Sequence, residues 1–308
     1  MGRRKGGTPI HGWIVLDKPL GMSSAQAVAA VRRLTGAAKA GHGGTLDPLA
    51  TGILPIALGE ATKTVAWAMN GRKTYAFRVR WGEARSTDDG EGEIVGTSAM
   101  RPDATAISNI LPSFTGIILQ IPPAFSAIKV DGERAYKLAR AGEEVVLAPR
   151  QAEILSLVHT GSPDADHADF EAVVGKGVYI RSLARDLAVA LGTLGSIVAL
   201  RRLRVGRFTL NEAISLDKVE ALGHSPAASK QMLPIETALD DIPALALTED
   251  EARRLRQGQS VMLVQADERE RLFQLGSGAV VQAKCGTNLV ALAEITAEGL
   301  RPVRVINI

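Results

Sequence analysis

A glycine-rich stretch, residues 41–52, limits how the backbone around it can run. It reads Gly-His-Gly-Gly-Thr-Leu-Asp-Pro-Leu-Ala-Thr-Gly and holds four glycines, one proline and a single aspartate, Asp47. Glycine adopts backbone angles that other residues resist, and Pro48 favours an extended conformation at Asp47. An apolar run, residues 53–58, follows at once. We therefore expect a loop that fixes one carboxylate and is anchored on a buried element.

A plain structural turn is the simpler interpretation of this stretch, because Asp and Gly are common turn residues. A phosphate-binding loop is not indicated, since no Lys-Ser or Lys-Thr pair follows the glycines and the chain has no G-x-G-x-x-G. Whether the loop is a functional site therefore depends on the other motifs of the chain.

The size and composition of the chain indicate a folded protein of more than one unit. Its 308 residues are 46% apolar, which allows a sizeable core and suggests a large domain with a small one. The single cysteine, Cys285, excludes an internal disulfide framework and a Cys-rich zinc site. No apolar run is long enough to span a membrane, and the basic N-terminus lacks the apolar core of a signal peptide. We expect a cytoplasmic protein whose residues 1–10 form a basic, disordered tail.

Basic residues concentrate in one segment, residues 176–207. It contains seven basic residues and one acid, a net charge of +6, whereas the whole chain carries +3. This favours a surface that binds a polyanion such as nucleic acid, and a solvated helix face is the alternative. Residues 85–92 are rich in carboxylates but have no His or Cys beside them, so we do not expect a metal site there.

Apolar periodicity predicts a mixture of strands and helices up to residue 243. The expected strands are residues 12–16, 75–81, 154–159 and 167–174, with a basic strand or turn at 200–208. The expected helices are one that begins at Ser23 and ends before Gly36, and others at 104–114, 133–141 and 182–191. Tyr179 and Arg181 precede the last of these helices; two apart on extended chain, they would point the same way.

The pattern changes after residue 243, where we place a domain boundary. A helix is expected from Thr248 to Gly258. Five short strands should then follow, at residues 261–264, 271–275, 279–283, 289–295 and 301–306. Short strands at this spacing are typical of a small β-barrel or sandwich.

Several motifs, in order along about 200 residues, resemble those of the bacterial-type tRNA pseudouridine-55 synthases. They are Gly-Trp-Ile-Val-Leu-Asp-Lys-Pro at 12–19, residues 42–52, Lys-Thr-Tyr at 73–75, Gln-Ile-Pro-Pro at 120–123 continuing to Ser-Ala-Ile-Lys at 126–129, residues 177–187 and Leu-Arg-Arg at 200–202. The resemblance implies an α+β catalytic domain with a mixed, largely antiparallel sheet at residues 11–243. Residues 244–308 resemble the family's small PUA-like RNA-binding β-barrel, with a fainter signature.

The resemblance also implies an activity, the conversion of uridine 55 in the T loop of tRNA to pseudouridine after the base is flipped out. No cofactor and no metal are implied, nor is a required protein partner, and a monomer is expected. Asp47 corresponds to the catalytic aspartate. It either attacks covalently or takes a proton from the ribose, and the sequence leaves both paths open. Arg181 would keep Asp47 ionised by a paired charge.

Four further residues acquire roles from the resemblance. Tyr75 would stack on the flipped uracil, and Tyr179 would line the site, contact the base and assist proton transfer from C5. Leu200 would close the pocket on its apolar side. His42 would fill the gap that the flipped base leaves in the RNA. Lys18 and Pro19 are interpreted as scaffolding under the pocket.

Two other functions remain open from the sequence. One is a relative of the same fold that modifies another RNA under the direction of a guide RNA, which would call for longer extensions than this chain has. The other is a non-catalytic protein that binds tRNA and helps it fold. Such a protein needs a basic surface and stacking aromatics but not Asp47 and Arg181 together, so the enzyme is favoured.

Overall fold

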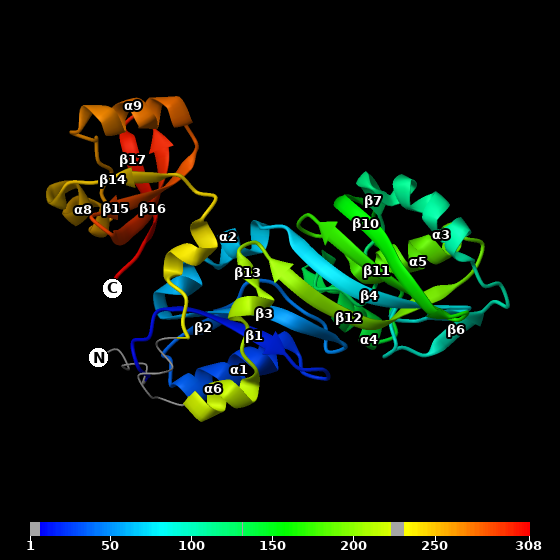
Figure 1. The fold of residues 1–308 in the computed structure, drawn as a ribbon. Coiled ribbons are helices and arrows are strands. Elements are labelled where there is room, and N and C mark those ends of the chain that lie inside the picture. Colours follow the sequence, from blue (N-terminus) through cyan, green and yellow to red (C-terminus); the bar gives the residue numbers. More distant parts are fainter. Residues whose placement is uncertain (1–6, 131, 223–230) are drawn as a thin grey trace.

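The computed structural model describes residues 7–130, 132–222 and 231–308. Within them, nine strands form one central sheet, with the path β1-β3-β12-β4-β11-β10-β7 and with β2 and β13 paired at its side. Helices α1 and α6 lie by β1, and α3 and α5 lie at the other end of the sheet (Figure 1). Neighbouring strands of this sheet are antiparallel except β3 and β12, so the expected mixed, largely antiparallel sheet is confirmed.

The elements of the large unit have the following bounds. The strands of the central sheet are β1 (Gly12–Lys18), β2 (Ala40–His42), β3 (Ala50–Leu58), β4 (Lys73–Trp81), β7 (Gly116–Gln120), β10 (Arg150–Asp164), β11 (His167–Val174), β12 (Gly195–Val205) and β13 (Phe208–Thr209). Two hairpins add β5 (Glu83–Arg85), β6 (Ile94–Thr97), β8 (Lys129–Val130) and β9 (Glu133–Arg134). The helices are α1 (Ser24–Thr35), α2 (Val65–Asn70), α3 (Ala104–Ile110), α4 (Ala135–Arg140), α5 (Ile180–Ala190) and α6 (Leu216–Leu222).

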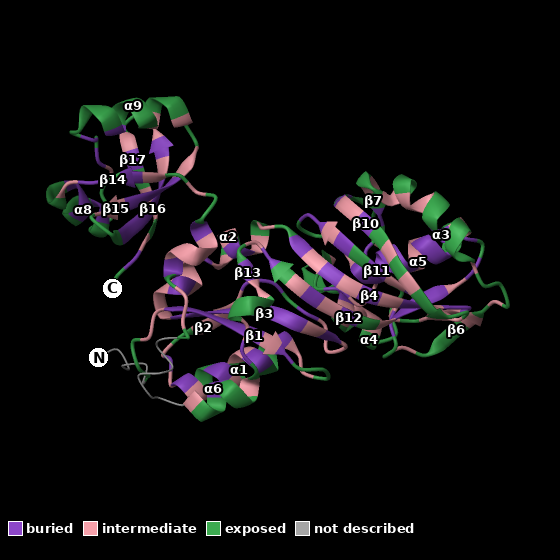
Figure 2. Ribbon diagram, in the orientation of Figure 1, coloured by how far each residue is buried: buried purple, intermediate pink, exposed green. Residues whose placement is uncertain are grey.

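Strands β1 and β3 are buried on both faces. Ile14 and Leu16 belong to the core under α1 and α5, whereas Trp13 and Val15 belong to a second core on the opposite face. A strand buried on both faces reads as a continuous apolar run rather than as an alternation. This explains the apolar residues 53–58, which form most of β3 (Figure 2).

Strand β4 shows the expected alternation. Tyr75, Phe77, Val79 and Trp81 are buried, and the residues between them are partly exposed. The β10–β11 pair and the capping box of α1 between Ser23 and Gln26 also confirm the sequence interpretation. Where the sequence allowed a strand or a turn at residues 200–208, the strand β12 is found.

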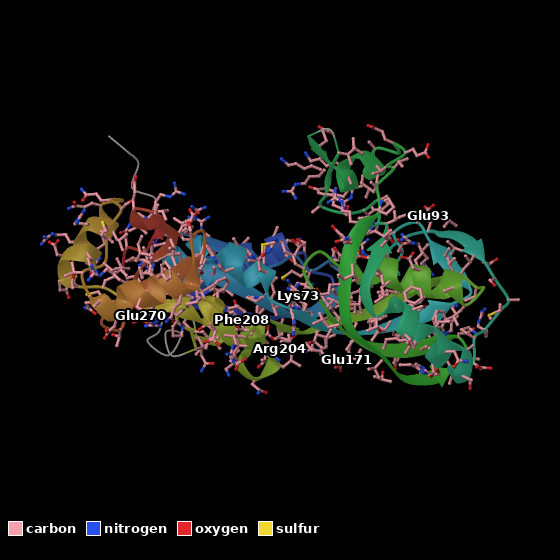
Figure 3. The ribbon with its side chains drawn as sticks, turned by 90° about the horizontal axis from the view of Figure 1, so that it is seen from above. Lys73, Glu93, Glu171, Arg204, Phe208 and Glu270 are labelled. Atoms are coloured by element: carbon pink, nitrogen blue, oxygen red, sulfur yellow. The ribbon has the colours of Figure 1, made fainter. Side chains whose placement is uncertain are left out.

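The chain between β7 and β10 forms an arm that rises from the sheet. It contains β8, β9 and α4, and it stands apart from the other green segments in Figure 3. Its base is fixed on α5, because Ser182 Oγ and Arg185 Nη2 donate to the carbonyl of Ile121 at 2.8 Å and 2.9 Å. The arm therefore meets the sheet near the N-terminus of α5.

Residues 244–308 form a separate four-stranded sheet with two helices. Its path is β14 (Ala244–Ala246), β15 (Val280–Cys285), β16 (Asn288–Thr296) and β17 (Gly299–Val305), with α8 (Glu249–Arg256) and α9 (Ala266–Leu275) packed against it. The last three strands and the helix after Thr248 confirm the predictions. The strand expected at 271–275 is wrong, because it is the end of α9. The strand expected at 261–264 is wrong as well, because only Val261 forms an isolated bridge, with Leu300.

The N-terminal tail was predicted to be disordered through residue 10. Residues 1–6 lie outside the described residues. From residue 7 on the structure differs from the prediction, because the Thr8 amide donates to the Gly36 carbonyl at 2.8 Å. Of the helices described, none has the length and apolar character needed to cross a bilayer.

Candidate active site

The loop that carries Asp47 joins β2 to β3 and is held along its backbone. Ser24 Oγ donates to the Leu46 carbonyl at 2.8 Å and accepts from the Leu46 amide at 2.7 Å. The Gly21 amide donates to the Pro48 carbonyl at 2.9 Å, and the Ala50 amide donates to the Asp47 carbonyl at 3.0 Å. The Asp47 side chain remains 38% exposed. The expected loop is therefore present, and its carboxylate is open to a ligand.

Arg181 lies against Asp47, as the resemblance implies. Its Nη2 is 3.0 Å from Asp47 Oδ2, and its side chain is only 6% exposed. The guanidinium also donates to the carbonyls of Thr87 and Phe125, both at 2.9 Å. These bonds attach the 85–92 loop and the arm to the planar guanidinium of a residue on α5. They therefore hold the guanidinium in one position beside the Asp47 carboxylate.

Asp89 is a second carboxylate on the same guanidinium, and the sequence interpretation missed it. Its Oδ2 is 3.6 Å from Arg181 Nε, and the residue is 2% exposed. Its Oδ1 accepts from Thr87 Oγ1 at 2.5 Å and from the Glu91 amide at 3.1 Å. The acidic composition of residues 85–92 was noted, but only as evidence about a metal. A buried arginine needs counter-charge, and that requirement could have directed attention to this loop.

Tyr179 is the N-cap residue of α5 and does not continue an extended strand to Arg181. The expectation that both point the same way along extended chain is wrong, because the helix already begins at Ile180. Gln120 holds the Tyr179 backbone instead: its Oε1 accepts from the Tyr179 amide at 2.8 Å and its Nε2 donates to the Tyr179 carbonyl at 3.1 Å. Burial raises the pKa of the Tyr179 phenol. The charge of Arg181 lowers this pKa, and the charge of Asp47 raises it.

Tyr75 and Leu200 lie on adjacent strands of the sheet. In the β4–β12 register Leu200 faces Phe77, two residues along from Tyr75, and on its other side Leu200 faces Ala50, three residues beyond Asp47. Both side chains are buried in the same core, at 9% and 8% exposure. The register therefore places Tyr75 and Leu200 near the beginning of β3, where the Asp47 loop enters the sheet.

His42 ends β2, opposite Ile56, at the start of the loop, whereas Leu200 faces Ala50 at the end of the loop. Burial, and after it the charge of Arg202, lowers the pKa of its imidazole. Its Nδ1 is buried and has no hydrogen-bond partner within the described residues. Within the described residues, no hydrogen bond or ion pair joins His42 to Asp47.

Lys18 lies under the loop, as expected of scaffolding. It is 1% exposed, and its Nζ donates to the carbonyls of Pro19, Met22 and Pro48 at 2.9, 2.6 and 3.4 Å. Burial lowers the pKa of its ammonium group to about 8, against the opposing attraction of Asp47. The ammonium group holds the turn after β1 and the Asp47 loop together.

The basic segment 176–207 does not form a continuous basic face. Arg181 and Arg202 are buried, at 5% and 1% exposure. Three others pair with carboxylates: Arg185 with Asp88 and Asp186, Arg201 with Asp17, and Arg207 with Asp240. Within the described residues, Lys176, Arg202 and Arg204 are the members of the segment that have no ion pair. Two of the seven basic side chains are therefore too buried to reach a polyanion, and a polyanion-binding surface at this segment stays a prediction that depends on the other five.

An open groove of about 600 Å³ runs beside the site, over the face of the sheet. Its walls include Leu20, Leu49 and Leu200, but not Asp47 or Arg181. In the parts of the chain that the structure describes, no group of three or more His, Cys, Asp or Glu side chains is arranged to hold a metal ion.

The fold matches that of solved structures. A chain in the crystal structure of the archaeal box H/ACA sRNP Nop10-Cbf5 complex superposes with a TM-score of 0.73 over 100% of this chain and 93% of its own length, at 22% identity. At that identity the likeness concerns the fold alone.

Sequence comparisons define the class of protein. The model of the TruB family pseudouridylate synthase N-terminal domain matches residues 32–180, and that of the tRNA pseudouridylate synthase B C-terminal domain matches residues 181–240. The fold is thus that of a pseudouridylate synthase.

Similar proteins in other organisms then narrow the class to a family. A protein named tRNA pseudouridine synthase B from Rhodospirillum rubrum is 56% identical over 310 residues, covering 100% of both chains. One of the same name from Bradyrhizobium diazoefficiens is 55% identical over 97% of this chain and 86% of its own. The chain belongs to the TruB family.

Proposed function

We propose that this chain converts uridine 55 in the T loop of tRNA to pseudouridine. Full-length relatives named tRNA pseudouridine synthase B, at 56% and 55% identity, support this activity. One structural observation assigns this activity to particular atoms: the exposed carboxylate of Asp47 lies 3.0 Å from the buried guanidinium of Arg181. A guide-directed function has only the shared fold in its favour.

Asp47 is the proposed catalytic residue. The paired guanidinium of Arg181 holds one carboxylate oxygen, Oδ2, which leaves Oδ1 to face the nucleotide. In the reaction the bond from N1 to the ribose C1′ breaks, the uracil turns, and C5 bonds to C1′. The proton on C5 then passes to solvent and N1 takes up a proton, so the product is an isomer and no oxidant or reductant is consumed.

The remaining site residues would hold the base once it leaves the RNA helix. Tyr75 offers an aromatic face for stacking, and Leu200 an apolar wall one strand away. The phenol of Tyr179, whose pKa is raised by burial, stays protonated at neutral pH and can donate a hydrogen bond to the uracil. His42, with its unpartnered Nδ1, would occupy the place in the RNA that the flipped base vacates.

Unmodified tRNA with tritium at C5 of its uridines provides the test, with no added cofactor or metal. Pseudouridine formation releases the C5 label into water, and we expect one label per tRNA, mapped to the T loop. Asp47→Asn should abolish release while tRNA affinity stays within about tenfold, or about 1.4 kcal/mol. Asp103→Asn is the matched control, because Asp103 caps α3 on the surface and Asn caps equally well.

The same assay distinguishes the proposed function from its alternatives. Tight tRNA binding without release of the label would indicate a non-catalytic tRNA-folding protein. Retained isomerisation by Asp47→Asn would contradict the role of Asp47, and release from a position outside the T loop would contradict the assigned site.

We further propose a division into a catalytic domain at residues 11–243 and an RNA-binding, PUA-like domain at residues 244–308. A hydrophobic core made wholly of residues between 245 and 300 supports the division. Action as a monomer, without a protein partner or cofactor and in the cytoplasm, remains a prediction of the sequence.

A further inference from the structure

Arg202 is an arginine with an unusual environment. It is 1% exposed and lies on β12 directly beside Gly52 of β3. Within the described part of the chain no carboxylate lies within ion-pair distance of it. A buried cation without a carboxylate is costly and persists only where other groups satisfy its donors.

Backbone carbonyls satisfy those donors, and all three belong to residues near Asp47. Arg202 Nη2 donates to the Gly44 carbonyl at 3.0 Å and Nη1 to the Thr45 carbonyl at 3.2 Å. Its Nε donates to the Ile53 carbonyl at 2.7 Å. The guanidinium therefore spans from the start of the Asp47 loop to the strand into which the loop runs.

The remaining anchors of the loop hold its later residues. Ser24 holds Leu46, and Lys18 and Gly21 hold Pro48. Only Arg202 bonds to Gly44 and Thr45 among the side chains that the structure describes. Without it the first half of the loop would have no side-chain anchor, and Asp47 could turn away from Arg181.

We propose that Arg202 is a positioning residue for Asp47: its guanidinium fixes the first half of the loop so that the carboxylate meets both Arg181 and the nucleotide. It acts through the carbonyls of Gly44 and Thr45 and touches neither the RNA nor the reacting atoms. This inference rests on the proposed function, because it assigns the role through Asp47.

Two variants separate the geometry of the guanidinium from its charge. Arg202→Lys keeps the charge but cannot span three carbonyls, and Arg202→Gln keeps two planar N–H donors without the charge. Arg101→Lys is the matched control, because Arg101 also holds two carbonyls, of Ser98 and Met100, but lies away from the loop. Each protein is measured for tRNA affinity, for single-turnover tritium release at saturating enzyme, and for amide hydrogen exchange in peptides covering residues 43–49.

We expect both Arg202 variants to release the label about 10- to 100-fold more slowly than the wild type. Their tRNA affinity should stay within about threefold, and exchange should accelerate in residues 43–49 but not elsewhere. A single-turnover rate within twofold of the wild type would overturn the proposal. So would a loss confined to affinity, because Arg202 would then act on the RNA, and so would loss of the whole fold in both variants.

Failure of this inference can be told from failure of the proposed function. If the wild type releases no label, the proposed function is wrong, and with it the catalytic meaning of the loop. If the wild type is active and the exchange of residues 43–49 is unchanged in the variants, only the role of Arg202 is wrong.

Discussion

At the scale of the residue, the buried ammonium group of Lys73 offers a test of how burial affects a charge in the core. Lys73 at the start of β4 (Figure 3) is 8% exposed, and its Nζ donates to the Met69 carbonyl at 2.5 Å. Burial, and after it the charges of Arg202 and Lys176, lowers the pKa of its ammonium group from an ordinary value of 10.5 to about 8. Between these two pH values the unfolded chain binds more protons at Lys73 than the folded chain does, so stability rises with pH.

The comparison with Lys73→Met isolates this effect, because every other group titrates in both proteins. We expect the free energy of unfolding of the wild type, minus that of the variant, to rise by about 1 kcal/mol from pH 7.5 to 9.5 after allowance for solvent screening. Urea denaturation at the two pH values measures it. A difference that falls or stays constant would contradict the lowered pKa.

The residues of the site were only partly predictable. Asp47 and Arg181 were named from motifs, and their 3.0 Å contact agrees with the pairing that the resemblance implied. Asp89 was not named from a motif. Its importance comes from its position beside the buried guanidinium of Arg181, and nothing in the sequence of the 85–92 loop indicates that position. Arg202 was expected on an RNA-binding surface. Whether Arg202 is buried depends on the order of the strands in the central sheet, which the local sequence does not reveal.

The close approach of β3 and β12 gives a test at the scale of the element. Gly52 has a φ of 95°, and a Cβ there would lie 2.2 Å from the Arg202 carbonyl oxygen. Gly52→Ala should therefore force apart the parallel pair that leads into the Asp47 loop, at a cost of about 3 kcal/mol or more.

A second glycine of the same stretch serves as the control. Gly41 in β2 has no atom within 4 Å of its Cβ position, so Gly41→Ala should leave stability nearly unchanged. Urea denaturation compares the two variants. Equal stability of Gly52→Ala and the wild type would show that the two strands can separate here without loss.

Elements with strong local signals were predicted, and those that depend on tertiary pairing were not. The alternation of β4 and the capping boxes at Ser23 and Thr248 specify their elements locally. Helix α9 was taken for a strand at 271–275 because only its short apolar end was considered. The Asp-Glu-Arg-Glu-Arg run before it favours a helix, and Arg271 pairs with Glu268 one turn earlier. The parallel pairing of β3 with β12 joins residues about 150 positions apart and has no local signal.

At the scale of the whole molecule, the C-terminal unit shares a core with the sheet. Leu289, Leu292 and Ile306 are buried in the same cluster as Trp13 and Phe208. Two hydrogen bonds cross the same boundary: Lys63 Nζ donates to the Val305 carbonyl, and the Asn307 amide donates to Glu60, both at 2.7 Å. The two units should therefore stabilise each other, although residues 245–300 also have a core of their own.

Tryptophan fluorescence can test this coupling in the full-length chain, because all three tryptophans, Trp13, Trp67 and Trp81, precede residue 243. Leu292→Ala removes a fully buried side chain of the C-terminal unit from the shared core, which costs about 2–5 kcal/mol. The melting temperature reported by tryptophan should then fall by about 5 °C or more. Phe273→Ala, at a residue 86% exposed on α9, should not change it. An unchanged tryptophan transition in Leu292→Ala would mean that the catalytic unit is stable without its C-terminal neighbour, and that the shared core only docks the two.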